Sequence, residues 1–214
     1  MKLEGIVKFK QNFNKTLSIE YKIIEELNHW RNILYQHGLI GQDDNLYHGA
    51  GYGNISKRLG SPNLCDSYRM SGFVITGTQT SKFSELTPEH YSIVKRCYPK
   101  KNLIISEGPI EASSESMTHG TIYALDKNIK FVFHVHSPEI WKNAEKLVIP
   151  VTRKEVPYGT PEMAEEVKRL FKETDLKNKR ILSMGGHEDG IISFGETADE
   201  TGQIILEYFN KSTR

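Results

Sequence analysis

The sequence has very little cysteine and almost no net charge. Cys65 and Cys97 are the only cysteines in 214 residues, and they match no metal-binding or redox spacing. This favours two reduced, buried or half-buried thiols in a cytoplasmic protein. With 28 basic and 27 acidic residues the net charge is +1. Nucleic acid is therefore not expected as a partner, because binding its phosphate backbone needs a basic excess.

Long apolar runs are also missing. Residues Met1 to Glu20 contain lysines but no apolar segment of the kind that a secretory signal needs. The other apolar runs are a few residues long, far short of a membrane span. No repeat, low-complexity tract or flexible linker divides the chain. The composition, 37% hydrophobic and 26% charged, predicts one globular domain over residues 1–214 with no membrane partner.

Helical and extended signals alternate along the chain. Apolar residues at helical spacing predict a first helix through residues 23–34, with Gly38 at its C-terminal cap. Thr87-Pro88-Glu89 and Thr160-Pro161-Glu162 each predict a helix start, with an N-cap threonine, a proline and an acid. A last helix carries residues 198–209. The predicted strands are Gly72–Thr76, Asn102–Ser106, Lys130–His136, Leu147–Val151, Arg180–Met184 and Gly190–Phe194. This alternation predicts a central sheet flanked by helices.

Two histidines within one predicted strand are the first candidate site. Side chains alternate between the two faces of a strand, so His134 and His136 share a face while Val135 points away. Two imidazoles on one face can reach a single metal ion. Taken alone, the pair is equally compatible with solvated histidines on a sheet surface.

Glu115 strengthens the metal hypothesis. It follows Ser113 and Ser114, either of which can cap the helix that continues through Tyr123. That helix leads into the His-Val-His strand, so its start is expected beside the end of the strand. His119, one turn later, can orient the carboxylate. The alternative is an ordinary acid that complements the helix dipole.

A third imidazole comes from His187, which has Gly185-Gly186 before it and Gly190 after it. The glycines suggest a backbone bent to aim this side chain, although an ordinary turn histidine is the alternative. Three imidazoles and one carboxylate suit zinc, and iron or nickel would also accept them. A carboxylate that can swing away would leave a coordination position for substrate.

Four blocks of the sequence resemble the class II aldolase/adducin family. They stand in the family's order, and a weaker fifth block runs from Gly186-His187 to Gly195. The four blocks are Gly53-Asn54-Ile55-Ser56, residues 73–78 together with 85–88, Ser113-Ser114-Glu115 with His119 and Tyr123, and residues 134–138. The glycine-rich stretch 49–53 is not a dinucleotide-binding loop, because the residues after it predict a strand.

The resemblance implies a three-layer α/β/α fold with a central mixed or antiparallel sheet, and a homotetramer with active sites at subunit interfaces. It implies a zinc site, or a site for another divalent metal, at Glu115, His134, His136 and His187, with Glu115 as acid and base. It also implies a phosphate site at Asn54, Thr78, Ser113 and Ser114. Hydroxyls, an amide and backbone N–H groups can hold a phosphate without lysine or arginine. Turn formation and helix capping are the alternative roles of these polar residues.

The chain departs from the family pattern in three places. Gln79 stands where family members usually have glycine, at the edge of the phosphate site. Glu188-Asp189 separate His187 from the glycine that normally follows the histidine at once. Ile149-Pro150 runs almost directly into residues 156–160, so the longer stretch that supplies a tyrosine acid to the neighbouring subunit is missing.

These features predict a metal-dependent lyase that cleaves a carbon–carbon bond of a phosphorylated or acidic sugar-like substrate. The metal would chelate a carbonyl and an adjacent hydroxyl oxygen and stabilise an enediolate, while Glu115 moves the proton. A sugar-phosphate 4-epimerase or a dehydratase on the same scaffold is the alternative. A non-enzymatic assembly module like the adducin head is a third hypothesis, although that head domain lacks the metal ligands. The sequence does not identify the substrate.

Overall fold

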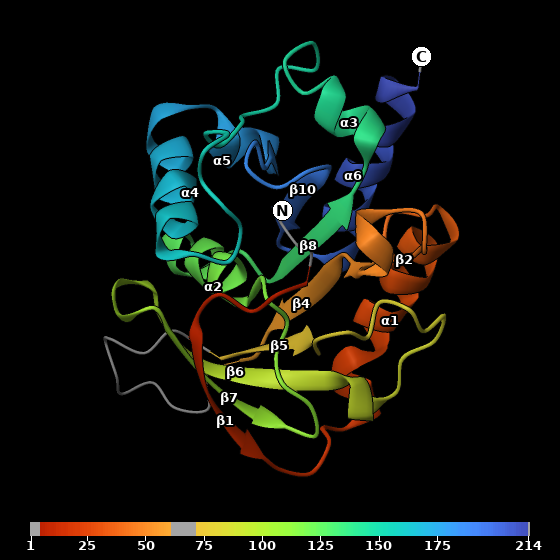
Figure 1. The fold of residues 1–214 in the computed structure, drawn as a ribbon, viewed down its shortest axis with the longest axis vertical. Helices are drawn as coiled ribbons and strands as arrows, with labels where there is room; N and C mark the ends of the chain where they lie inside the picture. Colours follow the sequence, from red (N-terminus) through yellow and green to blue (C-terminus); the bar gives the residue numbers. More distant parts are fainter. Residues whose placement is uncertain (1–4, 61–71, 214) are drawn as a thin grey trace.

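A mixed sheet of eight strands runs through the computed structural model, which describes residues 5–60 and 72–213 (Figure 1). The predicted thiol of Cys65 lies outside these residues, and Cys97 is buried, as expected. The strand order is β1-β7-β6-β5-β4-β8-β10-β9. β1 is parallel to β7, and the other neighbours are antiparallel. The strands are β1 Lys10–Lys15, β4 Asn54–Arg58, β5 Phe73–Thr76, β6 Tyr91–Tyr98, β7 Leu103–Gly108, β8 Phe131–His136, β9 Ile181–Ser183 and β10 Gly190–Gly195.

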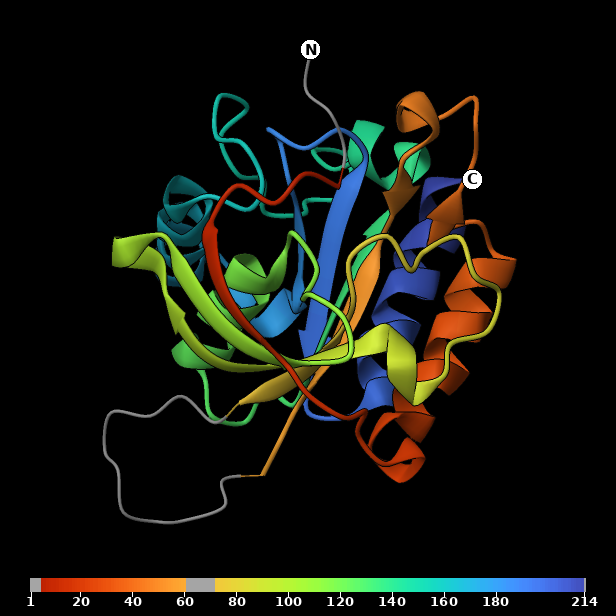
Figure 2. The same cartoon turned by 60° about the horizontal axis from the view of Figure 1, so that its bottom comes forward.

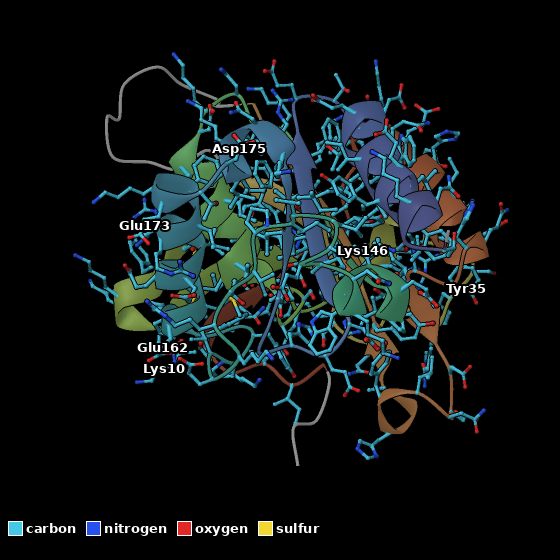
Figure 3. All side chains as sticks on the ribbon, turned by 90° about the horizontal axis from the view of Figure 1, so that it is seen from above. Lys10, Tyr35, Lys146, Glu162, Glu173 and Asp175 are labelled. Carbon is cyan, nitrogen blue, oxygen red and sulfur yellow. The ribbon has the colours of Figure 1, made fainter. Side chains whose placement is uncertain are left out.

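Helices cover both faces of this sheet, which gives the predicted three-layer α/β/α arrangement (Figures 1 and 2). On one face lie α1 Tyr21–Gln36, α3 Pro138–Lys142 and α6 Ala198–Ser212, and on the other α2 Ser116–Leu125, α4 Pro161–Glu173 and α5 Leu176–Lys179. Figure 3 shows the two layers from above, with Glu173 on α4 at one side and Tyr35 on α1 at the other. In the part of the chain that the structure describes, none of the helices combines the length and the hydropathy that a membrane span requires.

Strand β8 is buried on both faces, and its side chains alternate between two hydrophobic cores. Phe133 and Val135 pack in the core shared with α1, α3 and α6. Val132 packs in the core shared with α2 and α4. Because side chains two residues apart share a face, His134 and His136 project to the same side as Val132. The predicted pair of imidazoles therefore lies beneath the helix layer of α2 and α4.

Several predicted element ends are confirmed. Gly38 has φ +69° just after α1, where a residue with a side chain would be strained. Thr160 caps α4 by accepting a hydrogen bond from the Met163 backbone N–H. The glycine-rich stretch 49–53 leads into β4, a strand.

Two predicted elements are wrong. Thr87-Pro88-Glu89 opens only a 3-10 turn, Pro88–His90, after which β6 begins at Tyr91. The aromatic and β-branched residues of β6 pair with β5 and β7, so the sheet overrides a local helix start. The predicted strand Leu147–Val151 does not form, because Val148 has φ +55° and only Val151 makes a single bridge, to Ser183. Strand β1 and the short pair β2 Gly41–Gln42 and β3 Gly51–Tyr52 were not predicted.

The packing of α6 on α1 generates a stability prediction. Alanine normally stabilises a helix interior relative to glycine by about 1 kcal/mol. At Gly202 in α6, however, an added Cβ would lie 2.0 Å from the Trp30 ring. We expect Gly202→Ala to lower the free energy of unfolding by about 1–3 kcal/mol, measured by urea unfolding. Gly60→Ala, where a Cβ meets no atom within 4 Å, is the control. An unchanged or more stable Gly202→Ala protein would contradict this packing.

Candidate metal centre

Three histidine side chains meet at the end of β8. His134 and His136 come from β8, and His187 comes from the turn that joins β9 to β10. One ring nitrogen from each lies within 4.8 Å of those of the other two, and all three side chains are buried. The ring centroids are 4.8–5.0 Å apart. The structure thus brings together the three imidazoles that the sequence predicts as ligands.

The surroundings of two of these imidazoles suit a neutral ligand. The Nδ1 of His134 is 3.1 Å from the Ile191 carbonyl oxygen. An N–H donated there leaves Nε2 as the lone-pair nitrogen, which is the usual arrangement for a metal-binding histidine. Burial, followed by the nearby His187 and His134, holds the pKa of His136 well below its ordinary value. His136 is therefore uncharged at neutral pH.

Glu115 lies next to His187, but it is not in the group of side chains whose potential ligand atoms all lie within 4.8 Å of one another. Its Oε1 is 3.6 Å from the Nδ1 of His187, and its side chain is buried. Glu115 is itself the N-cap residue of α2, and no side chain caps this helix. The predicted capping by Ser113 or Ser114 is therefore wrong. The Ser113 carbonyl instead accepts hydrogen bonds from the backbone and the hydroxyl of Ser116. That turn leaves both serine hydroxyls available for another role.

His119 ties α2 to the sheet. Its Nδ1 is 2.7 Å from the hydroxyl of Ser56 on β4, and this hydroxyl is also 2.8 Å from the Tyr123 hydroxyl. The ring is fully buried, and burial holds its pKa well below the ordinary value. These contacts fix the first turns of α2, which carry Glu115, against β4. Orientation of the carboxylate by the His119 ring itself stays a prediction.

The glycines around His187 allow backbones to pack closely. An added Cβ at Gly185 would lie 2.3 Å from the Thr152 carbonyl oxygen, and one at Gly186 would lie 1.8 Å from that of Val156. The turn therefore packs directly on residues 152–156, which leaves no room for side chains. Asp189 takes a left-handed conformation, with φ +61°.

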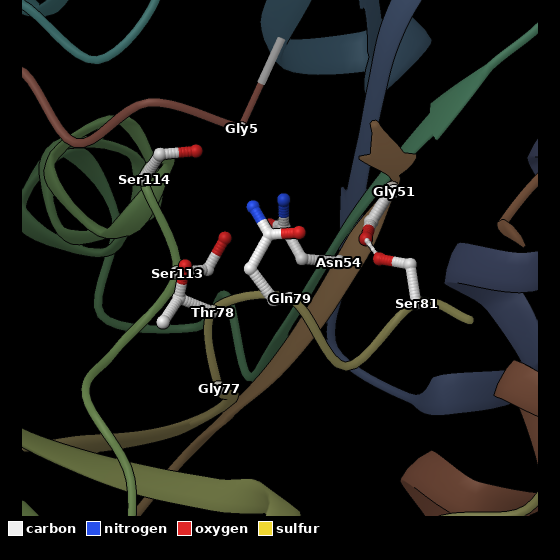
Figure 4. Close-up of a pocket in the computed structure, with 10 residues that line it drawn as sticks. Gly5, Gly51, Asn54, Gly77, Thr78, Gln79, Ser81, Ser113 and Ser114 are labelled. Carbon is white, nitrogen blue, oxygen red and sulfur yellow. Dashed lines mark hydrogen bonds between the residues drawn. The ribbon is translucent and has the colours of Figure 1, made fainter. Parts of the chain in front are cut away.

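A small pocket adjoins the histidine cluster and brings together all four residues predicted to bind phosphate. Asn54 is paired with His134 across the β4–β8 ladder, so the two side chains share a face. Ser113 and Ser114 directly precede Glu115 in the chain. The amide of Asn54 and the two serine hydroxyls point toward one space (Figure 4). The pocket is lined by Gly5, Gly51, Gly53, Asn54, Gly77, Thr78, Gln79, Ser81, Ser113 and Ser114. We call it the anion pocket, because it offers polar donors and no carboxylate.

Arg31 of α1 stabilises the loop that forms one wall of the anion pocket. Its guanidinium is buried and donates hydrogen bonds to the carbonyl oxygens of Ser84 at 2.8 Å and Ser81 at 3.0 Å, and also to that of Phe83. These bonds fix the loop that follows Thr78 and Gln79. Sequence reasoning missed Arg31, because it lies on the apolar face of a helix that only the tertiary fold brings to this loop.

Aromatic side chains on the other side of the histidines were not among the predicted site residues. The Tyr158 ring stacks on His187, with centroids 4.3 Å apart and planes at 26°. The Tyr47 ring meets His136 at 4.7 Å, and its hydroxyl donates to Asp189 at 2.7 Å. A second pocket is lined by Tyr47, Tyr158, His187 and Asp189 among others. Tyr47 has φ +49°, and such strain is common at functional sites.

A comparison with models of known families identifies the family of this chain. The model described as Class II Aldolase and Adducin N-terminal domain matches residues 43–209. The chain belongs to the class II aldolase and adducin family. A search of curated proteins found no match.

Solved structures of sugar-phosphate aldolases have the same fold. The chain is similar to a sugar-phosphate aldolase from Thermotoga maritima, with a TM-score of 0.64 and 17% identity over 90% of this chain and 93% of that one. It is also similar to the L-fuculose-1-phosphate aldolase from Thermus thermophilus, with a TM-score of 0.56 and 20% identity over 91% and 97%. YgbL from Escherichia coli, named as an aldolase, epimerase or decarboxylase, matches with a TM-score of 0.62 and 17% identity over 90% and 87%. At identities of 17–20%, these similarities establish that the chain has the same fold as these proteins.

The histidine cluster generates a prediction about metal content. Replacing His134 and His136 together by alanine removes two of the three imidazoles. If the cluster binds a divalent ion, we expect the purified variant to contain none. Folding should survive, because the hydrophobic cores on both sides of the sheet are untouched. Metal analysis and circular dichroism measure the two effects. The double variant His29→Ala/His37→Ala removes two exposed histidines of the α1 region and is the control. Equal metal content in both double variants would rule out the proposed ligands.

Proposed function

We propose that this protein is a divalent-metal-dependent lyase, with zinc as the favoured metal. Its substrate would be a phosphorylated or acidic sugar-like molecule in which a carbon–carbon bond is cleaved. One observation carries the proposal: three buried imidazoles with ring nitrogens within 4.8 Å of one another lie beside a buried glutamate and an uncharged pocket of amides and hydroxyls.

The donor set fits such an ion. Zinc is bound in proteins by imidazole nitrogens and carboxylate oxygens, so three histidines and one glutamate suit it. His134 and His136 are fixed by the sheet, and Glu115 stands at the start of a helix next to the anion pocket. A bound divalent ion would act as a Lewis acid for the substrate's carbonyl and stabilise the negative charge that develops when the bond breaks.

The protein's own residues would divide the remaining work. Asn54, Thr78, Ser113 and Ser114 would hold the substrate's anionic group in the anion pocket. Because Asn54 faces His134 across the ladder and Ser114 precedes Glu115, the anion would lie close to the reacting carbon atoms. Glu115, buried and 3.6 Å from His187, would move the proton at the carbon next to the carbonyl. Burial of these groups limits the access of water.

Epimerisation at a hydroxylated carbon and dehydration are the alternative reactions, because the same polarised carbonyl serves them as well. The assembly-module hypothesis has less support, since this chain keeps three histidines and a glutamate that such a module does not need.

Product analysis separates the enzymatic alternatives. The purified protein is incubated with candidate ketose phosphates and sugar acids, with and without a chelator. A lyase yields two carbonyl fragments, an epimerase an isomer of the same mass, and a dehydratase a product lighter by one water. Chelator-resistant activity would refute the proposal.

The role of Glu115 generates the next prediction. Glu115→Gln keeps the size of the side chain and one oxygen but removes the base. We expect turnover to fall by roughly 10² or more while metal content falls only modestly. If Glu115 only complemented the helix dipole, the substitution would lower the free energy of unfolding by roughly a few tenths of a kcal/mol, as is usual for a charge at a helix end. Turnover would then be unchanged.

Glu111→Gln, an exposed acid shortly before Glu115, is the matched control. Turnover is compared at equal metal content. A rate within a few-fold of the unmodified protein would mean that another group, such as Tyr158, moves the proton.

Assembly is a further expectation, which rests on the family resemblance. We expect a homotetramer with its active sites near subunit boundaries. Light scattering at the concentrations used for activity measurements would give the mass. A fully active monomer would refute the expectation.

A further inference from the structure

The segment Gly5–Lys8 lies before the family-matched part of the chain and touches both sides of the candidate site. It is anchored from Lys8 onward, where the Asn102 side chain donates to the Lys8 carbonyl oxygen at 3.2 Å and Phe9 is buried. Strand β1 then pairs with β7 along its whole length. The segment is thus held at the edge of the sheet while its first residues extend to the site. We call it the N-terminal strap.

Gly5 of the strap lines the anion pocket (Figure 4). Its φ is +72°, and an added Cβ would lie 3.0 Å from Nε2 of Gln79 and 3.8 Å from the Gly51 carbonyl oxygen. Gln79 also lines the pocket and has φ +58°. The amide of Gln79 therefore fills space that a glycine in its place would leave open. It lies so close to Gly5 that a Cβ there would be in tight contact with it.

The next residues of the strap contact Tyr158. The Ile6 backbone N–H donates to the Tyr158 hydroxyl at 3.1 Å, and the Lys8 ammonium is 3.2 Å from the ring centroid. His187 stacks on the same ring with centroids 4.3 Å apart. The ammonium and the imidazole are both too close to the ring to share one face, so the ring lies between them. Through Tyr158, the strap supports one candidate metal ligand while Gly5 borders the anion pocket.

We propose that the strap is part of the substrate site and that Gly5 and Gln79 together set which anionic group fits the anion pocket. This inference rests on the proposed function, because it takes that pocket to hold the substrate's phosphate or carboxylate. Gly5 keeps the Gln79 amide aimed into the pocket, where it adds a donor to those of Asn54 and the serines. A side chain at position 5 displaces that amide.

A double-mutant cycle tests the pair, with inorganic phosphate as the probe and calorimetry as the measurement. Gly5→Ala places a methyl group 3.0 Å from the Gln79 amide nitrogen, so the amide has to shift. We expect phosphate to bind more weakly, by about tenfold at most, because the hydrogen bond from this amide to the anion is weakened. Adding Gln79→Gly to Gly5→Ala removes the amide that the new methyl group at position 5 would contact. The double variant is therefore expected to bind phosphate as Gln79→Gly alone does, so the two effects are not additive.

Gly38→Ala is the matched control for backbone strain, because Gly38 has φ +69° but an added Cβ there meets no atom within 4 Å. It should leave phosphate binding unchanged. Phosphate binding by Gly5→Ala equal to that of the unmodified protein would overturn the proposal. So would a loss that persists fully in the Gln79→Gly background, since strain rather than the pocket would then be its cause.

Tyr158→Phe tests the second contact of the strap. It removes the oxygen that accepts the Ile6 N–H and keeps the ring that stacks on His187. Phosphate binding should weaken a few-fold while metal content stays the same. Unchanged phosphate binding would show that Tyr158 does not hold the strap.

Metal analysis on the same samples separates the outcomes. An unmodified protein that binds the ion but no phosphate would overturn the strap proposal and leave the metal centre standing. An unmodified protein that binds phosphate but contains no ion would refute the proposed function. If its variants still gave the expected double-mutant cycle, the roles of Gly5 and Gln79 would be supported.

Discussion

The double burial of β8 is the constraint on which the site depends. A strand with a core on each face must alternate its side chains between the two cores. A shift in register by one residue would move every side chain of the strand to the opposite face. Val132, Phe133 and Val135 fix that register through their packing. His134 and His136 then have to point into the layer beneath α2. The same register places Asn54 opposite His134 and Gly190 opposite His136, so the anion pocket and the His187 turn follow from the ladder.

Much of the fold and the core of the site could be predicted from the sequence because their signals are local. The alternation of residues 131–136, the cap at Thr160 and each family block can be identified from a few consecutive residues. The errors arose where distant contacts decide. Thr87-Pro88-Glu89 carries a good helix start, but pairing with two neighbouring strands turns the following residues into β6. Val148 is β-branched, yet it takes a left-handed conformation that no local rule indicates.

The surroundings of the site were least predictable for the same reason. Arg31 reaches Ser84, in the loop beyond Gln79, across 53 residues of sequence. Tyr47 meets Asp189 across 142 residues, and Ile6 meets Tyr158 across 152. Gln79 stands out as a departure from the family, but its closeness to Gly5 depends on where β1 joins the sheet edge. The residues next to these supporting side chains in the sequence give little indication of their role, because the contacts that define it are with distant segments.

The three histidines among the candidate ligands also differ in how firmly the backbone holds them. His134 and His136 belong to a strand with a hydrogen-bonded neighbour on each side, whereas His187 sits in a turn. Turns open locally at a lower free energy than central strands. An ion that binds as proposed would therefore meet two imidazoles already in place and recruit the third last, and it would leave in the reverse order. In such a protein, exchange of the ion with solution would be governed by the dynamics of one short hairpin turn and not by unfolding of the sheet.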